Sequence, residues 1–381
     1  MLLRFLPCLG MGLGWHGADS RHPHHRGIAR DLRSHRGRKA GRPLAQCVAN
    51  LRFVPTARKN ARFLTTILAS TALAVLFCPA PLRAWGCKGH QTIAFIAEKQ
   101  LTPEATRFVE KLLRENPVDP QLNSYCGPQL NLLAAASTWP DDIRRQRANT
   151  APWHYINIPR GATVRDLKEY CGDQGCVTQA IAEQLAILKD KNIEPSRRAE
   201  ALRFVVHFVA DLHMPLHASD NNDLGGNCVP IEYFGLHPSA HNNSFSPNLH
   251  SLWDTTILER DTQTLDASQL AYYLEERFAA RMDSWRGGGI HVADWTWESH
   301  NLAESVVYAE LQPKIPTETP VAMKNCADAD NIGARMLALH VTAGEAYQSK
   351  AAPIVQERLA QAGVRLAMIL NDAAAASLSP N

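Results

Sequence analysis

Long hydrophobic runs are almost absent from this chain of 381 residues. The one exception, residues 63–78, is shorter than the roughly 20 apolar residues that a membrane-spanning helix usually needs. Three basic residues precede it, and the short segment 79–84 follows it. A basic start, a short apolar stretch and a small-residue exit are typical of a secretory signal peptide. We therefore expect residues 58–84 to be removed by cleavage after Ala84, although Leu82 departs from the usual A-x-A pattern.

Acidic residues are scarce before this cleavage site. Residues 1–84 contain 14 of the 40 Lys and Arg residues but only 2 of the 37 Asp and Glu residues. The remaining chain has 26 basic and 35 acidic residues and a formal charge of −9, against +3 for the whole sequence. A broad basic groove for duplex DNA is not expected on such a protein. Any anionic substrate therefore needs a local source of positive charge.

Residues 1–57 lack hydrophobic periodicity and hold clusters of Arg and His, such as the segment 21–42. A basic nucleic-acid-binding arm, or metal contacts through His24 and His25, are alternative interpretations. A segment of this composition cannot bury a core. We therefore interpret residues 1–57 as an unstructured leader or as the result of a wrongly assigned start codon.

Paired cysteines at zinc-finger spacing are also absent. Loss of residues 1–84 leaves six cysteines, an even number that suggests disulfides in an exported chain: Cys87, Cys126, Cys171, Cys176, Cys228 and Cys326. Cys171 and Cys176 bracket the turn-prone sequence GDQG, so they are expected to close a small loop. The other four cysteines allow three pairings, among which the sequence does not choose.

No alternating strand pattern persists in the sequence, apart from one short strand expected at 229–234, and there is no repeat or internal linker. Thr102 and Pro103 mark the start of a second helix. The other helical runs are expected at 90–101, 129–147, 176–190, 196–213, 249–259, 266–284, 292–311 and 328–372. Residues 218–248 are expected to form a long loop rich in Asn, Gly, Ser and Pro. We predict a single all-α domain over residues 85–376.

The strongest chemical motif is FVVHFVADLHMPLH, at residues 204–217. His207 and Asp211 are four residues apart and therefore share one face of a helix. The apolar residues around them predict a helix that is buried on nearly all sides. A buried Asp beside a buried His is costly unless something pairs with it. Pro215 then ends the helix, and His217 returns toward its end.

Three further motifs supply ligand-type residues. In NLHSLWD, His250 and Asp254 repeat the four-residue spacing, while STWPDDIR places Asp141 and Arg144 one turn apart and APWHYINIP contains His154. Alone, each has an ordinary structural explanation, such as a charge at a helix terminus or a packed ring. Together with the first motif they give four His and three Asp, a residue set that zinc prefers. The combination favours a polynuclear metal site.

These motifs occur in one order: W-G-x-x-G-H after the signal, then W-x-D, W-H-Y, H-F-x-x-D-x-H-x-P-L-H, G-G-N and N-L-H-S-x-W-D. The set resembles the zinc-dependent single-strand-specific nucleases of the mung bean nuclease type, also called the S-one/P-one type or 3′-nucleotidase/nuclease family. The resemblance extends over residues 85–370. It implies an all-α fold shared with zinc-dependent bacterial phospholipase C, and a cluster of three zinc ions.

The resemblance also implies the ligands of each zinc ion. The first ion would be held by Asp141, His154, His207 and Asp211. The second would be held by His217, His250 and Asp254. The third would be held by the free amine and carbonyl of Trp85, by His90 and by the second oxygen of Asp211. Since the Trp85 amine exists only after cleavage, the precursor would lack a complete third site.

The implied reaction is hydrolysis of single-stranded DNA and RNA to 5′-phosphates, with 3′-nucleotides as further substrates. Zinc lowers the pKa of a bound water toward about 7, and a bridging hydroxide would attack phosphorus in line. Asp141 would orient or deprotonate this nucleophile, and Arg144 would stabilise charge on the phosphoryl oxygens. The third zinc would stabilise the leaving 3′-oxygen. Three zinc ions would also attract an anionic substrate to an acidic protein.

The resemblance places Tyr155 where a base would stack beside the zinc cluster. Asn157 stands where better-known members carry an Asp that contacts the base edge, which leaves the base preference open. Gly225, Gly226 and Asn227 match the family's G-G-N, where the glycines would let the backbone approach the site and Asn227 would support substrate or a ligand. Ordinary packing near the metals is the alternative for Tyr155 and Asn157.

Two other functions remain as alternatives: a zinc-dependent phospholipase C acting on lipid head groups, and a non-catalytic, zinc-stabilised secreted binding protein. Asp254 argues against the first, because that branch typically has Glu there. Arg144 and Tyr155 argue against the second, because structural zinc needs neither. We expect a secreted or periplasmic monomer without stable membrane association.

Overall fold

The computed structural model describes residues 85–122, 124–241, 244–318, 326 and 337–378. By internal contacts the chain divides into two units, residues 1–74 and 75–381, and all described residues belong to the second. The expected leader and signal peptide lie outside the described residues. Within the described ranges, no helix is both long enough and apolar enough to cross a membrane.

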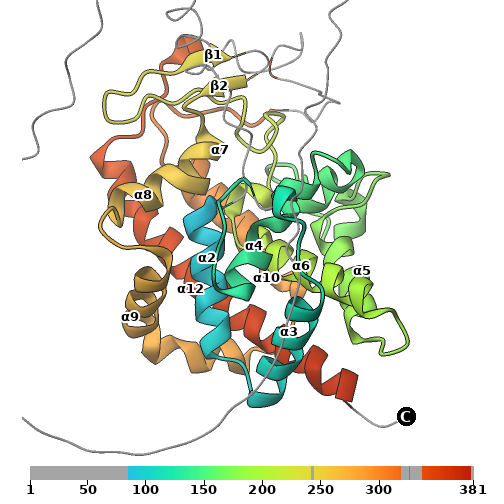
Figure 1. Cartoon of the computed structure of the whole chain (residues 1–381). Helices are drawn as coiled ribbons and strands as arrows, with labels where there is room; N and C mark the ends of the chain where they lie inside the picture. The colour runs from blue at the N-terminus through green and yellow to red at the C-terminus, as the bar shows by residue number, and fades with distance from the viewer. Residues whose placement is uncertain (1–84, 123, 242–243, 319–325, 327–336, 379–381) are drawn as a thin grey trace, which may run out of the picture. The chain divides into compact units, whose positions relative to one another are not determined.

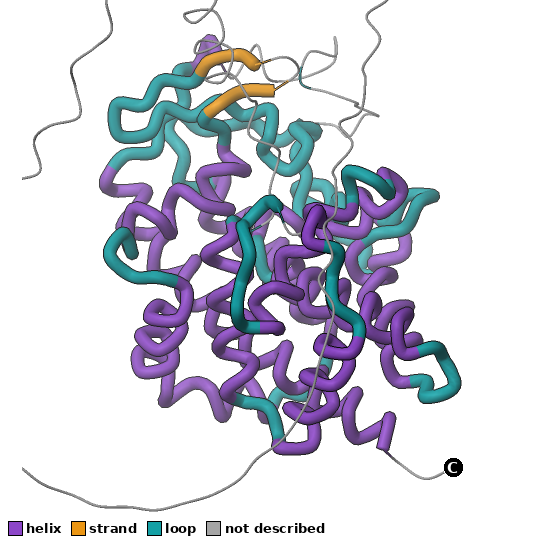
Figure 2. Tube along the Cα trace, viewed as in Figure 1, coloured by secondary structure: helices purple, strands orange, loops and turns teal. Residues whose placement is uncertain are grey.

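Helices supply nearly all the regular structure of the described residues (Figure 2). The α-helices are α2 (Cys87–Lys99), α3 (Pro103–Glu115), α4 (Leu132–Ile143), α5 (Val177–Lys189), α6 (Pro195–Leu212), α7 (Leu249–Ser251), α8 (Ile257–Asp261), α9 (Ala267–Gly287), α10 (Val292–Leu302) and α12 (Glu345–Leu378). The 3₁₀ turns are η2 (Pro120–Leu122), η3 (Ala148–His154), η4 (Leu167–Tyr170) and η5 (Pro215–Ala218), and the π-helical turns are η6 (Leu252–Thr256) and η7 (Ala303–Tyr308). Two short strands, β1 (Ser239–His241) and β2 (Ser244–Ser246), pair antiparallel. The predicted all-α class is confirmed.

Capping residues explain where the early helices begin. The Thr102 hydroxyl accepts a hydrogen bond from the Ala105 N–H at 3.2 Å, and Pro103 occupies the first turn of α3, as the sequence predicted. The Asn131 side chain caps α4 in the same way, accepting from the Ala134 N–H at 2.8 Å. Such caps satisfy N–H groups that have no partner within the helix.

Helix α6 is the element around which the site is built. It packs against α4, α5 and α12, and every residue from 201 to 212 is buried. Figure 1 shows α2, α4 and α6 as neighbours, with the long helix α12 running diagonally across the group. Because α6 has no solvent-facing side over these residues, its His and Asp side chains lie in the interior.

Three disulfides link the described residues. Cys171 and Cys176 pair, as expected from the turn between them. Of the three pairings left open for the other cysteines, the structure has Cys87–Cys126 and Cys228–Cys326. The first joins α2 to the segment before α4, and the second joins the G-G-N loop to a segment 98 residues further along the chain.

Two expected elements are wrong in detail. Residues 229–234 form no named strand but make isolated bridges, Pro230 with Asn248 and Glu232 with Thr342. The helix expected at 328–372 is not continuous: residues 337–339 form a short helical turn, and the long helix α12 begins at Glu345. Residues 327–336 lie outside the described ranges. The backbone just before α12 makes hydrogen bonds to another segment and so does not continue the helix. The Glu232 N–H donates to Val341 O, and the Ala343 N–H donates to Glu232 O, each at 2.9 Å.

Candidate functional site

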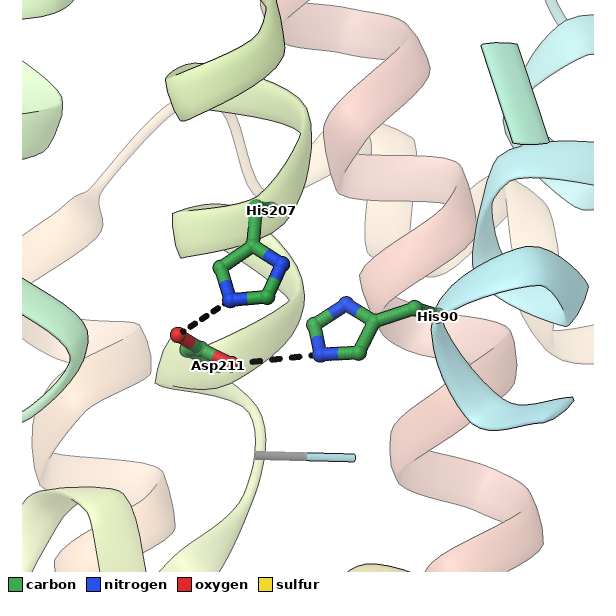
Figure 3. Close-up of side chains that lie close together, drawn as sticks. All are labelled: His90, His207 and Asp211. Carbon is green, nitrogen blue, oxygen red and sulfur yellow. Dashed lines mark ion pairs between the residues drawn. The ribbon is translucent and has the colours of Figure 1, made fainter. Parts of the chain in front are cut away.

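Asp211 lies at the centre of the site, on the last turn of α6, with no exposed surface. One carboxylate oxygen, Oδ2, lies 3.1 Å from His207 Nε2, one helical turn earlier. The other, Oδ1, lies 3.4 Å from Nε2 of His90 on α2 (Figure 3). The two oxygens of one carboxylate thus face histidines from two different helices, a geometry suited to a ligand shared between two ions.

Asp141 and His154 complete the first cluster from two other elements. His154, at the end of η3, places Nδ1 3.0 Å from both Asp211 Oδ2 and His207 Nε2. Asp141, in the last turn of α4, places Oδ1 4.0 Å from His207 Nε2. The ligand atoms of Asp141, His154 and His207 all lie within 4.8 Å of one another, as do those of His90, His207 and Asp211. His207 therefore belongs by distance to both groups.

A third group forms where η5 meets the turn that follows the long loop. His250 Nε2 lies 3.1 Å from Asp254 Oδ2, and His217 Nε2 lies 3.9 Å from Asp254 Oδ1. The ligand atoms of these three residues also lie within 4.8 Å of one another. Asp254 stands in the π-helical turn η6, a conformation that is rare overall and frequent at functional sites.

Backbone carbonyls fix the tautomers of three histidines. The Nδ1–H of His207 donates to Ser137 O at 2.7 Å, that of His217 to His154 O at 2.8 Å, and that of His250 to Gly225 O at 2.7 Å. A carbonyl can only accept, so the proton sits on Nδ1. In the neutral form of each ring, Nε2 presents its lone pair to the cluster, as a metal-ligating histidine requires.

Several buried polar atoms of the site have no hydrogen-bond partner among the described residues. They are both ring nitrogens of His90, both carboxylate oxygens of Asp141 and Asp254, Nε2 of His154 and Oδ1 of Asp211. Leaving such atoms unsatisfied in the interior is costly, and native proteins rarely do so. These atoms are imidazole nitrogens and carboxylate oxygens, which are typical metal ligands. Their grouping in one place fits a metal cluster, because bound ions would satisfy them.

Burial favours the neutral form that metal binding needs in three of the histidines, but it opposes ionisation of the aspartates. Desolvation lowers the pKa of His217 to about 3 and also lowers the pKa of His90 and His154, so these rings are neutral near pH 7. For Asp211, burial opposes ionisation, but the neighbouring His207 and His217 outweigh it and hold the pKa of the carboxyl well below its usual value. Burial outweighs His250 at Asp254 and raises its pKa to about 6.

The start of the domain is packed against both His-x-x-x-Asp motifs. The Trp85 side chain is fully buried, and its indole N–H donates to Ala210 O at 3.0 Å, directly before Asp211. The Gly86 N–H donates to Asp254 O at 2.8 Å. A Cβ at Gly86 would lie 2.6 Å from the Thr255 hydroxyl, so any other residue would force a local shift. Trp85 is thereby fixed against the backbone that directly precedes Asp211.

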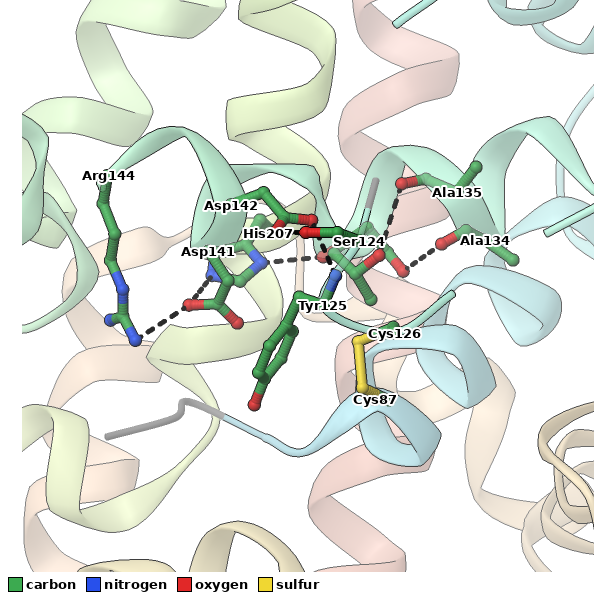
Figure 4. Close-up of a disulfide and its surroundings, with 12 residues drawn as sticks. Cys87, Ser124, Tyr125, Cys126, Ala134, Ala135, Asp141, Asp142, Arg144 and His207 are labelled. Carbon is green, nitrogen blue, oxygen red and sulfur yellow. Dashed lines mark hydrogen bonds and ion pairs between the residues drawn. A yellow bond between two sulfur atoms is a disulfide. The ribbon is translucent and has the colours of Figure 1, made fainter. Parts of the chain in front are cut away.

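Arg144 caps the C-terminal end of α4 and reaches the edge of the cluster. Its Nη2 lies 3.5 Å from Asp141 Oδ1, and its side chain is 21% exposed (Figure 4). Asp141 is nearly fully buried. The guanidinium thus stands between the interior carboxylate and solvent, where a phosphate group can approach it.

The expected substrate residues separate into two kinds. Tyr155 and Asn157 are exposed, while His154, Ile156 and Ile158 between and beside them are buried, as in an extended segment with alternating faces. Asn227 is buried and donates from Nδ2 to Leu224 O at 2.7 Å. Its amide therefore helps to hold the loop, whereas Tyr155 and Asn157 face outward.

Three residues that were not predicted from the sequence hold the G-G-N loop. Asp220 Oδ1 accepts hydrogen bonds from the N–H groups of Asp223 and Gly225, each at 3.1 Å. Asp223 is fully buried, and the Tyr308 hydroxyl donates to its Oδ2 at 2.9 Å. Gly225 in turn provides the carbonyl that orients His250. The two aspartates shortly before G-G could have been recognised in the sequence as candidates for holding the loop. Tyr308 could not, because it lies 85 residues further along the chain.

Comparison with known proteins agrees with this geometry. Residues 85–375 match the protein-family profile described as S1/P1 Nuclease. Endonuclease 5 of Arabidopsis thaliana is 30% identical over 303 residues, which cover 75% of this chain and 89% of that protein. Nuclease S1 of Aspergillus oryzae is 29% identical over 301 residues, covering 75% and 91%. Nuclease P1 of Penicillium citrinum is 33% identical over 182 residues, covering 46% and 59%. The chain belongs to the S1/P1 nuclease family and is a hydrolytic nuclease.

Proposed function

We propose that this nuclease is a secreted or periplasmic endonuclease that cleaves single-stranded DNA and RNA to 5′-phosphate products and also removes phosphate from 3′-nucleotides. The observation that carries the proposal is the cluster of buried, unsatisfied His and Asp atoms around Asp211, with Arg144 and Tyr155 at its edge. The three disulfides fit an oxidising compartment.

Three zinc ions are the proposed cofactor, because imidazole and carboxylate are donors that zinc accepts readily. The first ion is assigned to Asp141, His154, His207 and Asp211. The second is assigned to His217, His250 and Asp254. The third is assigned to His90, Asp211 and the amine and carbonyl of Trp85. When bound, the zinc ions would polarise phosphoryl oxygens and lower the pKa of water.

The chain itself supplies orientation and charge. Burial opposes ionisation of Asp141, but nearby His207 and Arg144 outweigh it and lower the pKa of this carboxyl. Asp141 is therefore ionised near pH 7 and can accept a hydrogen bond from the attacking water. Arg144 can donate two hydrogen bonds to the phosphoryl oxygens, where negative charge grows as the bond to the leaving oxygen breaks. Single-strand preference follows from Tyr155 and Asn157, which only an unstacked base can reach.

The domain limits are part of the same proposal. Residues 58–84 are proposed as a signal peptide, and residues 85–376 as the nuclease domain. Cleavage before Trp85 releases the amine that completes the third site. The mature protein is proposed to act as a monomer without stable membrane association.

The proposal is tested by hydrolysis of denatured DNA, RNA, 3′-AMP and phosphatidylcholine, with and without chelator. We expect cleavage of the first three, loss of activity with chelator and recovery on adding zinc. Cleavage of lipid alone would instead support the phospholipase C alternative. Absence of hydrolysis by zinc-loaded protein would support the binding-protein alternative.

A further inference from the structure

The segment that carries Tyr155 is held on two sides by different parts of the chain. On the metal side, the Ile156 N–H donates to His217 O, and His217 Nδ1–H donates to His154 O, both at 2.8 Å. On the other side, the Val177 N–H donates to Tyr155 O at 3.0 Å. The backbone of Tyr155 is extended, with φ −148° and ψ 171°, and its side chain is left 39% exposed.

The contacts on the second side depend on a small loop. The disulfide between Cys171 and Cys176 closes it, and Val177, which follows directly, is the first residue of α5. Within the loop, Gln174 O accepts a hydrogen bond from the indole N–H of Trp153 at 3.0 Å. The loop is therefore connected to the segment before Tyr155 through a side chain, and to Tyr155 itself through the backbone.

Trp153 connects this loop to the core. Its ring packs edge-on against Phe204 of α6, with centroids 5.7 Å apart. Two residues further on, Tyr155 directly follows the site residue His154. Burial raises the pKa of its hydroxyl, and the charges of Asp220 and Arg144 act on it as well. Because His154 belongs to the first cluster, the ring of Tyr155 is placed to contact a nucleotide whose phosphate Arg144 binds under the proposed function.

We propose that Trp153 and the loop closed by Cys171 and Cys176 are positioning residues that fix Tyr155 as the platform for the substrate base. The inference rests on the proposed function, in which Tyr155 stacks on a base. A platform strengthens binding most when it is already in place, because ordering a free side chain and its backbone on binding costs entropy. Opening the loop removes the restraint on one side of Tyr155 and leaves the carbonyls that orient the metal ligands unchanged.

The test compares a substrate that has a base with one that lacks it: 3′-AMP and the abasic tetrahydrofuran 3′-phosphate. The variants are the double substitution Cys171→Ser with Cys176→Ser, and Trp153→Phe, which keeps a ring but removes the N–H donor. Tyr155→Ala is the reference and Asp173→Ala, in the same exposed loop, is the control. For both test variants we expect KM for 3′-AMP to rise about tenfold, as expected for loss of most of one stacking contact. Their kcat and all kinetics on the abasic substrate should stay within about twofold of wild type.

Two results would overturn the inference: unchanged KM for 3′-AMP in both variants, or equal losses on both substrates. Zinc content and circular dichroism are measured on every variant, and if the double cysteine variant does not fold, Trp153→Phe decides. Wild-type protein that hydrolyses neither substrate would contradict the proposed function instead. The double variant is a further check. Because Trp153 is proposed to act through Tyr155, adding Trp153→Phe to Tyr155→Ala should raise KM no further, so the two effects should not add.

Discussion

Backbone carbonyls orient three histidines of the candidate site. The i, i+4 spacing correctly indicated contact between His207 and Asp211 and between His250 and Asp254, each pair meeting at 3.1 Å. The spacing did not indicate that a distant carbonyl would fix each of these rings through Nδ1. A carbonyl can be supplied by any residue type, so its position follows from the fold and not from a local motif.

Arg144 offers the most direct test at the residue scale. We expect Arg144→Ala to lower kcat on 3′-AMP by about 10²- to 10³-fold, the range found when one donor to a developing charge is removed. The kcat of Arg144→Lys should lie between those of wild type and Arg144→Ala, because Lys keeps the charge but lacks the paired donors. The measurement is steady-state kinetics with zinc content verified for each variant.

Arg147→Ala is the matched control for Arg144. Arg147 lies three residues further on and forms a surface pair with Glu200, with Nη1 to Oε1 at 2.7 Å. Exposed ion pairs contribute little, so this variant should keep its activity and stability nearly unchanged. Equal loss of kcat in both variants would show a general charge effect and contradict the role given to Arg144.

Asp223 gives a prediction on pH. Burial, with the charge of Asp220, raises the pKa of Asp223 to about 7, above the value of about 4 in an unfolded chain. Between these values the folded state holds a proton that the unfolded state has lost. The stability from this group is therefore complete below pH 4 and is lost as pH rises toward 7, at up to about 1.4 kcal/mol per pH unit.

The measurement is the difference in unfolding free energy between wild type and Asp223→Asn, both without metal, from pH 4 to 8. Asparagine keeps the size of the protonated carboxyl and does not titrate. Wild type should lose stability relative to the variant as pH rises to about 7 and then level off. A difference that is constant across this range would contradict the raised pKa.

At the scale of elements, helices were predictable and their irregular ends were not. The limits expected for α5, α6 and the start of α9 lie within one residue of those observed, because apolar periodicity and capping act locally. The run expected at 249–259 is instead α7, the π turn η6 and α8. Nothing in local propensity signals the π turn, which carries Asp254 and receives the Gly86 N–H at the start of the domain.

The G-G-N loop is an element whose conformation orients His250, a proposed metal ligand. Gly225 has φ +61°, and a Cβ there would lie 2.8 Å from Leu216 O. Gly225→Ala should therefore shift the carbonyl that accepts from His250. We expect the variant to bind about one zinc fewer per chain at limiting free zinc, measured by elemental analysis after dialysis.

Gly287→Ala is the control for this change. Gly287 is the last residue of α9, and a Cβ there meets nothing within 4 Å. Alanine also favours a helix more than glycine does, so stability should be equal or slightly higher. Full zinc binding by Gly225→Ala would show that the carbonyl does not set the orientation of His250.

At the scale of the whole molecule, the two His-x-x-x-Asp motifs and the domain start form one assembly. The Trp85 indole is bonded to the carbonyl before Asp211, and the Gly86 N–H to the carbonyl of Asp254. The disulfide from Cys87 to Cys126 holds the same terminus to the segment before α4 (Figure 4). The sequence order of the motifs predicted that they belong to one site. It did not predict the hydrogen bonds of Trp85 and Gly86, which join segments more than 100 residues apart.

Under the proposed zinc assignment, the exact start of the mature chain determines the metal content. A free amine at Trp85 can donate its lone pair to zinc, whereas an amide nitrogen in a longer chain cannot do so at neutral pH. Protein that begins at Trp85 is therefore expected to bind three zinc ions, and protein that retains Ala84 to bind two and to show much lower activity. Because Trp85 is fully buried and anchored through its indole, both forms should fold alike by circular dichroism. The measurement is intact mass and N-terminal sequence of secreted protein, with zinc counted per chain for both forms. Three zinc ions and full activity in the form that retains Ala84 would rule out the amine as a ligand.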